Sequence, residues 1–211
     1  MATTPVIEID VYGADDMSGI AINAYGMPSL VTPNEPQALQ MALQSAFNDS
    51  GVTVLNLASG GTSSSLQNML AGVDGGGNPF AQRVTEHPGV IVVDNHGIND
   101  ALGGETLQDY TTDLAKFIND VRAVGKIPIL EEPGPVCDGN HPQLASYVQA
   151  MDSVASSYGV ALIQQYTYIQ GISGWCDHMT GGFYPDAYID GLKAQQELAI
   201  IGPLIKGLTG G

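Results

Sequence analysis

Basic residues are scarce in this chain: Lys and Arg together number 6 against 22 Asp and Glu, which gives a formal net charge of -16. Charged residues make up only 13% of the 211 residues, so the imbalance reflects missing cations more than an excess of acids. A surface of this sign repels phosphate backbones and anionic lipid headgroups. We therefore expect neither a nucleic acid nor a membrane as a partner.

Long apolar runs are also missing, and no stretch approaches the roughly 20 apolar residues that a membrane-spanning helix needs. The first residues, Met1-Ala-Thr-Thr-Pro5, lack the basic and apolar regions of a signal peptide. The sequence thus predicts a soluble chain with no transmembrane segment and no leader. A virion-associated and a secreted context both stay open, as does the oligomeric state.

Cysteine is nearly absent, and Cys137 and Cys176 form neither a CxxC pair nor a zinc-binding pattern. We expect no cofactor and no metal. Two free thiols and one disulfide are equal alternatives at this point.

Short apolar strands alternate with amphipathic helices along the whole chain, without a repeat or a linker. Five strands are predicted, at 6–12, 52–57, 90–94, 127–130 and 160–163. Helices are predicted over 37–49, 60–70, 106–121, 142–157 and 186–205. Pro128 predicts incomplete pairing of the fourth strand, and Pro203 is expected to bend or end the last helix. Strands separated by helices indicate one α/β domain over residues 1–211, with a parallel sheet between two helical layers.

Polar and glycine-rich segments follow the strands, at the edge where parallel sheets bind ligands. In chain order they read Gly13-Ala-Asp-Asp-Met-Ser-Gly19, Asn56-Leu-Ala-Ser-Gly-Gly61, Gly97-Ile-Asn-Asp100 and Gly181-Gly-Phe-Tyr-Pro185. These segments resemble four sequence blocks of the SGNH (GDSL-type) hydrolases, which read Gly-Asp-Ser-x-x-x-Gly, Asn-x-Gly-x-x-Gly, Gly-x-Asn-Asp and Asp-x-x-His-Pro. The resemblance implies a three-layer α/β/α sandwich of flavodoxin-like architecture. Its five-stranded sheet is expected in the order 2-1-3-4-5, with the four blocks converging at its carboxyl edge.

The same resemblance implies that the catalytic residues have been replaced. Asp15 stands at the position of the nucleophilic serine, and Gly181 and Tyr184 stand at those of the aspartate and the histidine. Ala58 replaces a glycine whose N–H binds the oxyanion, and Asn99 alone keeps its family identity there. A carboxylate repels a developing oxyanion, and a tyrosine with a pKa of about 10 is a poor base near pH 7. The family's triad mechanism is therefore predicted to be absent.

A rearranged catalytic set would need other residues. The segment Asp138-Gly-Asn-His141-Pro142 matches Asp-x-x-His-Pro better than the expected block does, with Ser18 or Ser59 as the nucleophile. The same segment also fits the polar cap and first-turn proline of a helix.

Two further groups of ionisable residues deserve separate interpretations. Asp177 and His178 offer a second acid–base pair, whereas His87 and His96 are interpreted as loop or packing residues. Asp15, Asp16 and Asp100, joined by Asp138 or Asp177, would gather carboxylates in one crevice. Such a group suits Ca²⁺ or acid–base hydrolysis of glycosides. The alternative is that Asp16 is solvated and Asp100 caps the segment that follows it.

Three functions follow from these observations. The first is a non-catalytic SGNH-fold domain that binds a glycan or acylated saccharide at Asp15, Ala58, Asn99 and Tyr184, or that serves as an assembly module. The glycan is implied by the resemblance, because active relatives deacetylate glycans, including as phage tail modules and secreted enzymes. Phe183, Tyr184 and Trp175 would suit sugar faces. The second function is an esterase or carbohydrate deacetylase with a rearranged site, and the third is a carboxylate-based glycoside hydrolase.

Overall fold

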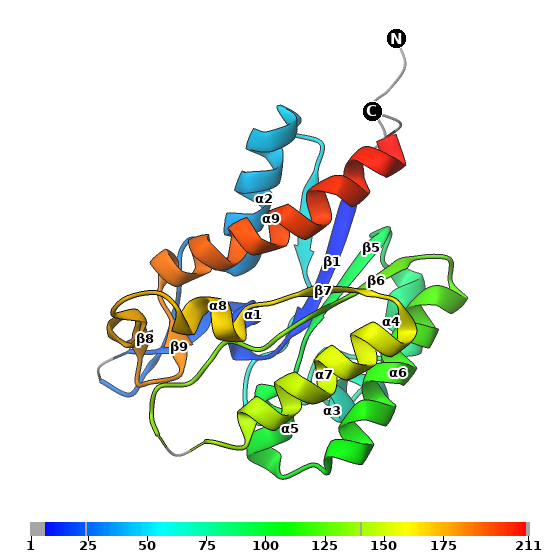
Figure 1. The fold of residues 1–211 in the computed structure, drawn as a ribbon. Helices are drawn as coiled ribbons and strands as arrows, with labels where there is room; N and C mark the ends of the chain where they lie inside the picture. Colours follow the sequence, from blue (N-terminus) through cyan, green and yellow to red (C-terminus); the bar gives the residue numbers. More distant parts are fainter. Residues whose placement is uncertain (1–6, 24, 140, 210–211) are drawn as a thin grey trace.

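Five parallel strands form the central sheet of the computed structural model, which describes residues 7–23, 25–139 and 141–209 (Figure 1). The strands are β1 (Glu8–Gly13), β4 (Thr53–Asn56), β5 (Ile91–Asn95), β6 (Ile127–Glu131) and β7 (Ala161–Ile163). They lie in the order β4-β1-β5-β6-β7, which is 2-1-3-4-5 when these five strands are counted along the chain. The predicted sheet is thereby confirmed; the predicted first residue of its first strand, Val6, lies outside the described residues.

Helices cover both faces of this sheet (Figure 1). One face carries α2 (Glu35–Phe47) and α9 (Ala187–Thr209). The other carries α3 (Leu66–Ala71), α4 (Phe80–Glu86), α6 (Leu107–Ala123) and α7 (Leu144–Tyr158). Strand side chains alternate between the faces, so Ile91 and Val93 of β5 pack under α2 and α9 while Val92 packs on the opposite side. Coverage of both faces explains why β5 reads as a continuous apolar run.

Three details differ from the sequence prediction. The helix expected from residue 60 begins only at Leu66, because Gly61 has a positive φ and starts a turn in which its carbonyl accepts the Ser64 N–H. Ser65 then caps the helix by accepting the Asn68 N–H. Strand β6 pairs with β5 and β7 on its two sides, so Pro128 does not interrupt it. Helix α9 neither stops at Pro203 nor near residue 205 but continues to Thr209.

Short elements at the carboxyl edge of the sheet escaped the sequence prediction because they span only 2–6 residues, too few to show a period. They are α1 (Asp15–Ser18), β2 (Ile20–Ile22), β3 (Pro28–Leu30), α5 (Ile98–Gly103), α8 (Tyr166–Gln170), η1 (Trp175–His178), β8 (Met179–Thr180) and β9 (Tyr184–Pro185). Over the described ranges, no helix is both long enough and apolar enough to cross a bilayer.

Candidate functional site

Asp15, at the position of the family's serine, opens the short helix α1 directly after β1. Gly13 permits this sharp turn, because a Cβ there would lie 2.8 Å from the Cβ of Met17. The Asp15 Oδ1 accepts a hydrogen bond of 2.6 Å from the N–H of Gly61, in the second block. The carboxylate therefore binds the backbone of the neighbouring loop.

Of the four residues predicted to bind a ligand, Asp15, Asn99 and Tyr184 border one cavity of about 210 Å³. The residues that line it are Asp15, Asp16, Thr62, Ile98, Asn99, Leu102, Phe183 and Tyr184. Ala58 is not among them. Within the described part of the chain, the lining includes no serine, cysteine or histidine, so the cavity lacks the groups of a Ser-His or Cys-His nucleophile pair.

The two groups that bind the oxyanion in the family have other partners here. The Ala58 N–H donates to the Asn56 Oδ1 at 3.1 Å. The Asn99 Nδ2 donates to the carbonyl oxygens of Gly61 at 3.1 Å and Ser64 at 2.9 Å. An amide nitrogen carries two protons, so both donors of Asn99 are in use. Both donors are therefore bonded to groups of the protein, within or just after the second block.

Burial controls the charge of the acidic groups in the cavity. It raises the pKa of Asp15, against the lowering effect of the Gly61 N–H. Asp16 is only 7% exposed, which contradicts the interpretation that it is solvated. Burial raises the pKa of Asp16 to about 7, opposed by Lys193 and reinforced by Glu35 and Asp15. The pKa of Tyr184 is raised by burial and then by Asp15 and Asp16, so this phenol keeps its proton.

The family model of the GDSL-like lipase/acylhydrolases matches residues 23–188. The chain belongs to this family. The match starts after Gly19, so it includes the second to fourth blocks and leaves out the block in which Asp15 replaces serine.

Solved structures of similar fold include several with this family's names. A lipase/acylhydrolase from Enterococcus faecalis superposes with a TM-score of 0.70 at 17% identity, over 97% of this chain and 96% of that chain. An acetylxylan esterase from Geobacillus stearothermophilus gives a TM-score of 0.70 at 14% identity, over 93% of this chain and 94% of that chain. A member of the lipolytic protein G-D-S-L family from Veillonella parvula gives a TM-score of 0.67 at 16% identity, over 93% of this chain and 98% of that chain. At these identities the likeness shows the fold alone. The curated protein sequences contain no match.

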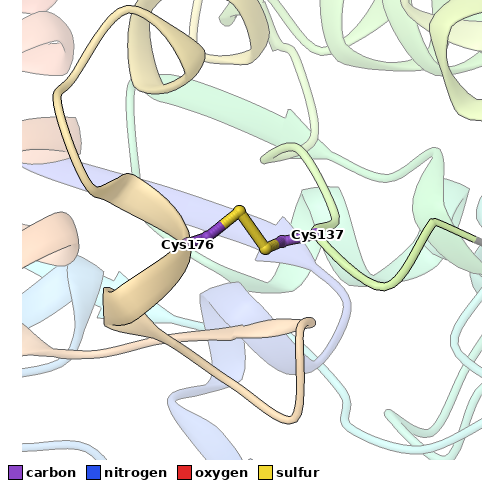
Figure 2. The surroundings of a disulfide bond; sticks show 2 residues. All are labelled: Cys137 and Cys176. Atoms are coloured by element: carbon purple, nitrogen blue, oxygen red, sulfur yellow. A yellow bond between two sulfur atoms is a disulfide. The ribbon is translucent and has the colours of Figure 1, made fainter.

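A disulfide joins Cys137 and Cys176 in this GDSL-family chain, which decides between the two cysteine alternatives (Figure 2). The bond joins the loop after β6 to η1. Beside it, the Cys137 N–H donates to the Gly182 carbonyl oxygen at 2.7 Å. The loop that carries the alternative acid–base pair is thus attached to the segment that carries Phe183.

That pair is formed: the Asp138 Oδ2 lies 2.7 Å from the His141 Nδ1, and the His141 ring contacts Phe183 with 5.1 Å between centroids. The intervening Asn140 lies outside the described residues. Neither candidate nucleophile borders the cavity. Ser18 Oγ donates to the Asp15 carbonyl at 2.8 Å, and Ser59 Oγ donates to Asp74 Oδ2 at 3.3 Å.

The remaining histidines and Asp100 have structural partners. The His178 Nδ1 lies 2.8 Å from the Asp186 Oδ2, so His178 pairs with Asp186 instead of Asp177. The carbonyl oxygen of His87 accepts a hydrogen bond from the Lys126 Nζ. His96 is buried with its Nδ1 2.6 Å from the Asp94 Oδ1. The Asp100 Oδ1 accepts the Leu66 N–H at 2.8 Å, so Asp100 caps α3 and not the segment that follows it.

A buried cluster of acids behind the cavity was missed by the sequence reasoning. Ligand oxygens of Glu35, Glu131 and Glu197 lie within 4.8 Å of one another, and in the described chain this is the one place where three potential metal ligands converge. The Lys193 Nζ lies 2.5 Å from the Glu35 Oε2 and supplies a positive charge there. Asp190, Lys193 and Glu197 recur at spacings of three and four on α9, so polar residues on a helical stripe were the available signal.

Proposed function

We propose that this GDSL-family domain binds a saccharide in its crevice without hydrolysing it through a Ser-His-Asp triad. The observation that carries the proposal is the composition of the cavity wall. The aromatic rings of Phe183 and Tyr184 suit the apolar C–H faces of a sugar, and Asp15 and Asp16 can accept hydrogen bonds from its hydroxyl groups. Concave sites of this kind, apolar with a few convergent polar groups, are typical of small-molecule binding.

The chemistry of the cavity opposes triad hydrolysis. Asp15 occupies the nucleophile position, and loss of triad members costs on the order of 10⁴ to 10⁶ in rate. The family's oxyanion donors, Ala58 and Asn99, are bonded to Asn56 and to the loop carbonyls. One structural neighbour is an acetylxylan esterase, whose name refers to a glycan, and this supports a saccharide as the ligand.

The test combines reactivity with binding. Fluorophosphonate probes should leave the protein unlabelled, and p-nitrophenyl acetate turnover should stay at background. Titration with neutral xylo- and chito-oligosaccharides, followed by two-dimensional NMR, should shift the resonances of the cavity residues. Tyr184→Ala should weaken binding at least about tenfold, since it removes one of the two aromatic walls. The matched variant Tyr158→Ala changes a tyrosine at the far end of α7 and should leave binding unchanged. Absence of binding to every saccharide would refute the proposal.

A rearranged esterase is the second candidate, favoured by the 2.7 Å contact between Asp138 and His141. It predicts ester turnover that disappears in His141→Ala and in Ser18→Ala. The hydrogen bond from Ser18 to the Asp15 carbonyl speaks against Ser18 as its nucleophile.

A carboxylate-based glycosidase is the third candidate, favoured by two carboxyls in one cavity, of which Asp16 has a pKa of about 7. One protonated and one ionised carboxyl are the groups that such hydrolysis uses. This function predicts new reducing ends from the same oligosaccharides, with no probe labelling, and loss of that activity in Asp16→Asn.

A further inference from the structure

A second hollow of about 360 Å³ adjoins the cavity, because Thr62 and Asn99 line both. The residues around it are Thr62, Ser65, Gln67, Asn68, Asn99, Asp100, Gly103, Gly104, Glu105, Thr106 and Asp109. These side chains are polar or absent, in contrast to the aromatic and aliphatic side chains of the first cavity. The crevice thus has an apolar end and a polar end. The volume of the polar hollow by itself lies within the range of about 300–1,000 Å³ that is typical of ligand sites.

Five carboxylates border the two hollows, and no lysine, arginine or histidine is among the described residues that line them. They are Asp15 and Asp16 in the cavity, and Asp100, Glu105 and Asp109 in the polar hollow. Such a wall attracts a cationic group and repels a uronic acid or a phosphate.

Asp100 is the most deeply buried acid of the polar hollow. It is 1% exposed, and apart from the proton that it shares with Glu105, its Oδ2 receives no hydrogen bond from the described residues. Glu105 lies beside it, and burial together with Asp100 and Asp113 raises the pKa of Glu105 to about 8, so the neighbouring carboxyls hold a shared proton near neutral pH. Two basic groups lie near this wall: His96 contacts Asp94 and also acts to lower the pKa of Asp100, and Lys116 pairs with Asp120.

An ammonium group fits this wall better than a metal ion does. A metal needs three or more ligand atoms that converge on one point, and the described residues meet that condition only at the buried Glu35, Glu131 and Glu197. An ammonium instead donates up to three separate hydrogen bonds, each to an acceptor in its own direction. It can therefore replace the proton shared by Asp100 and Glu105 without requiring a common centre.

We propose that the polar hollow is a second subsite of the crevice and that it selects saccharides with a free amine over N-acetylated and anionic saccharides. The inference rests on the proposed saccharide binding and adds the ligand class. A glucosamine-containing oligomer would place one ring against Phe183 and Tyr184 and the amine of the next ring at Asp100 and Glu105.

The experiment compares three trisaccharides by isothermal titration calorimetry: the glucosamine trimer, its fully N-acetylated form, and trigalacturonic acid. We expect the glucosamine trimer to bind at least about tenfold more tightly than the acetylated trimer, with a preference that shrinks as salt screens the carboxylates. Glu105→Gln should reduce that preference at least about threefold, mainly by weakening the binding of the glucosamine trimer.

Because the whole chain carries a charge of -16, a general attraction for cations must be separated from a subsite. Glu86→Gln makes the same chemical change at an exposed position on α4, outside both hollows. An equal loss of preference in both variants would overturn the inference, as would equal affinity of the wild-type protein for the amine and the acetylated trimer. In either case binding of the acetylated trimer would leave the proposed function standing. If none of the three trimers binds, the proposed function fails as well.

Discussion

Asp190→Asn is expected to stabilise the domain near neutral pH. Asp190 lies on α9 at 1% exposure, and neither of its carboxylate oxygens has a hydrogen-bond partner among the described residues. Burial first, and then Glu35, raise the pKa of Asp190 from 3.8 to about 9, although Lys193 acts in the opposite direction. The folded protein therefore retains a proton that the unfolded chain releases.

The direction of the pH effect follows from proton linkage. Between about pH 4 and pH 9 the folded state binds more protons at this site than the unfolded state does, so stability falls as the pH rises. At pH 7 the pH is about three units above the pKa of the carboxyl in the unfolded chain. At 1.4 kcal/mol per unit, this lowers the free energy of unfolding by about 4 kcal/mol. Asparagine is neutral in both states and removes this cost. Since neighbouring acids share the protons of the cluster, we expect a realised gain of about 2–4 kcal/mol.

Urea unfolding at pH 5 and pH 7 measures the effect. The gain from Asp190→Asn should be about 1–2 kcal/mol at pH 5 and should rise toward pH 7, because the unfolded carboxyl is more fully ionised there. Asp177→Asn makes the same chemical change at an exposed position and should leave the free energy of unfolding unchanged at both pH values. A destabilised Asp190→Asn protein at pH 7, or a gain that does not depend on pH, would refute the reasoning.

Three further outcomes are expected. Lys193→Met removes the cation of the buried acid cluster and should lower the free energy of unfolding, measured in urea, by about 3–5 kcal/mol. Lys206→Met, at an exposed position, should lower it by less than about 0.5 kcal/mol. Equal losses in the two variants would contradict the role of Lys193. The Cys137→Ser/Cys176→Ser variant should lose about 2–4 kcal/mol, with NMR changes confined to the two joined loops; an unchanged melting temperature would contradict this. A variant with Asp15→Ser, Gly181→Asp and Tyr184→His restores the three triad side chains. Its p-nitrophenyl acetate turnover should stay at background, because both oxyanion donors are bonded elsewhere. Turnover above background would show that these donors can be released.

The fold followed from the sequence because it depends on regular signals. Alternating strands and helices, with blocks after particular strands, determine which loops meet at the carboxyl edge. The neighbourhood of Asp15, Asn99 and Tyr184 could therefore be predicted before any distance was known. The hydrogen bonds at this edge could not be predicted, because they depend on loop conformations that no periodic pattern specifies; the bond from the Ala58 N–H to the Asn56 side chain is one example.

The buried acid cluster shows a different limit. Its α9 members, Asp190, Lys193 and Glu197, have a helical spacing that the sequence displays. Glu35 and Glu131 come from α2 and β6, which lie far from α9 along the chain. Only tertiary packing brings them beside Lys193, so no local pattern reveals that the acids share one desolvated site.

The Cys137–Cys176 disulfide makes the shape of the crevice depend on the redox history of the protein. The bond closes a loop of 39 residues in sequence separation, and it constrains the loop that bonds the Gly182 carbonyl, next to Phe183 of the cavity wall, while the sheet is held by its own core. Closing such a loop is worth about 4 kcal/mol in the chain-entropy description. Protein made in a reducing cytoplasm should then reach the same sheet with a looser wall. Preparations with identical secondary structure could therefore differ in ligand affinity, and thiol titration is the measurement that tells them apart.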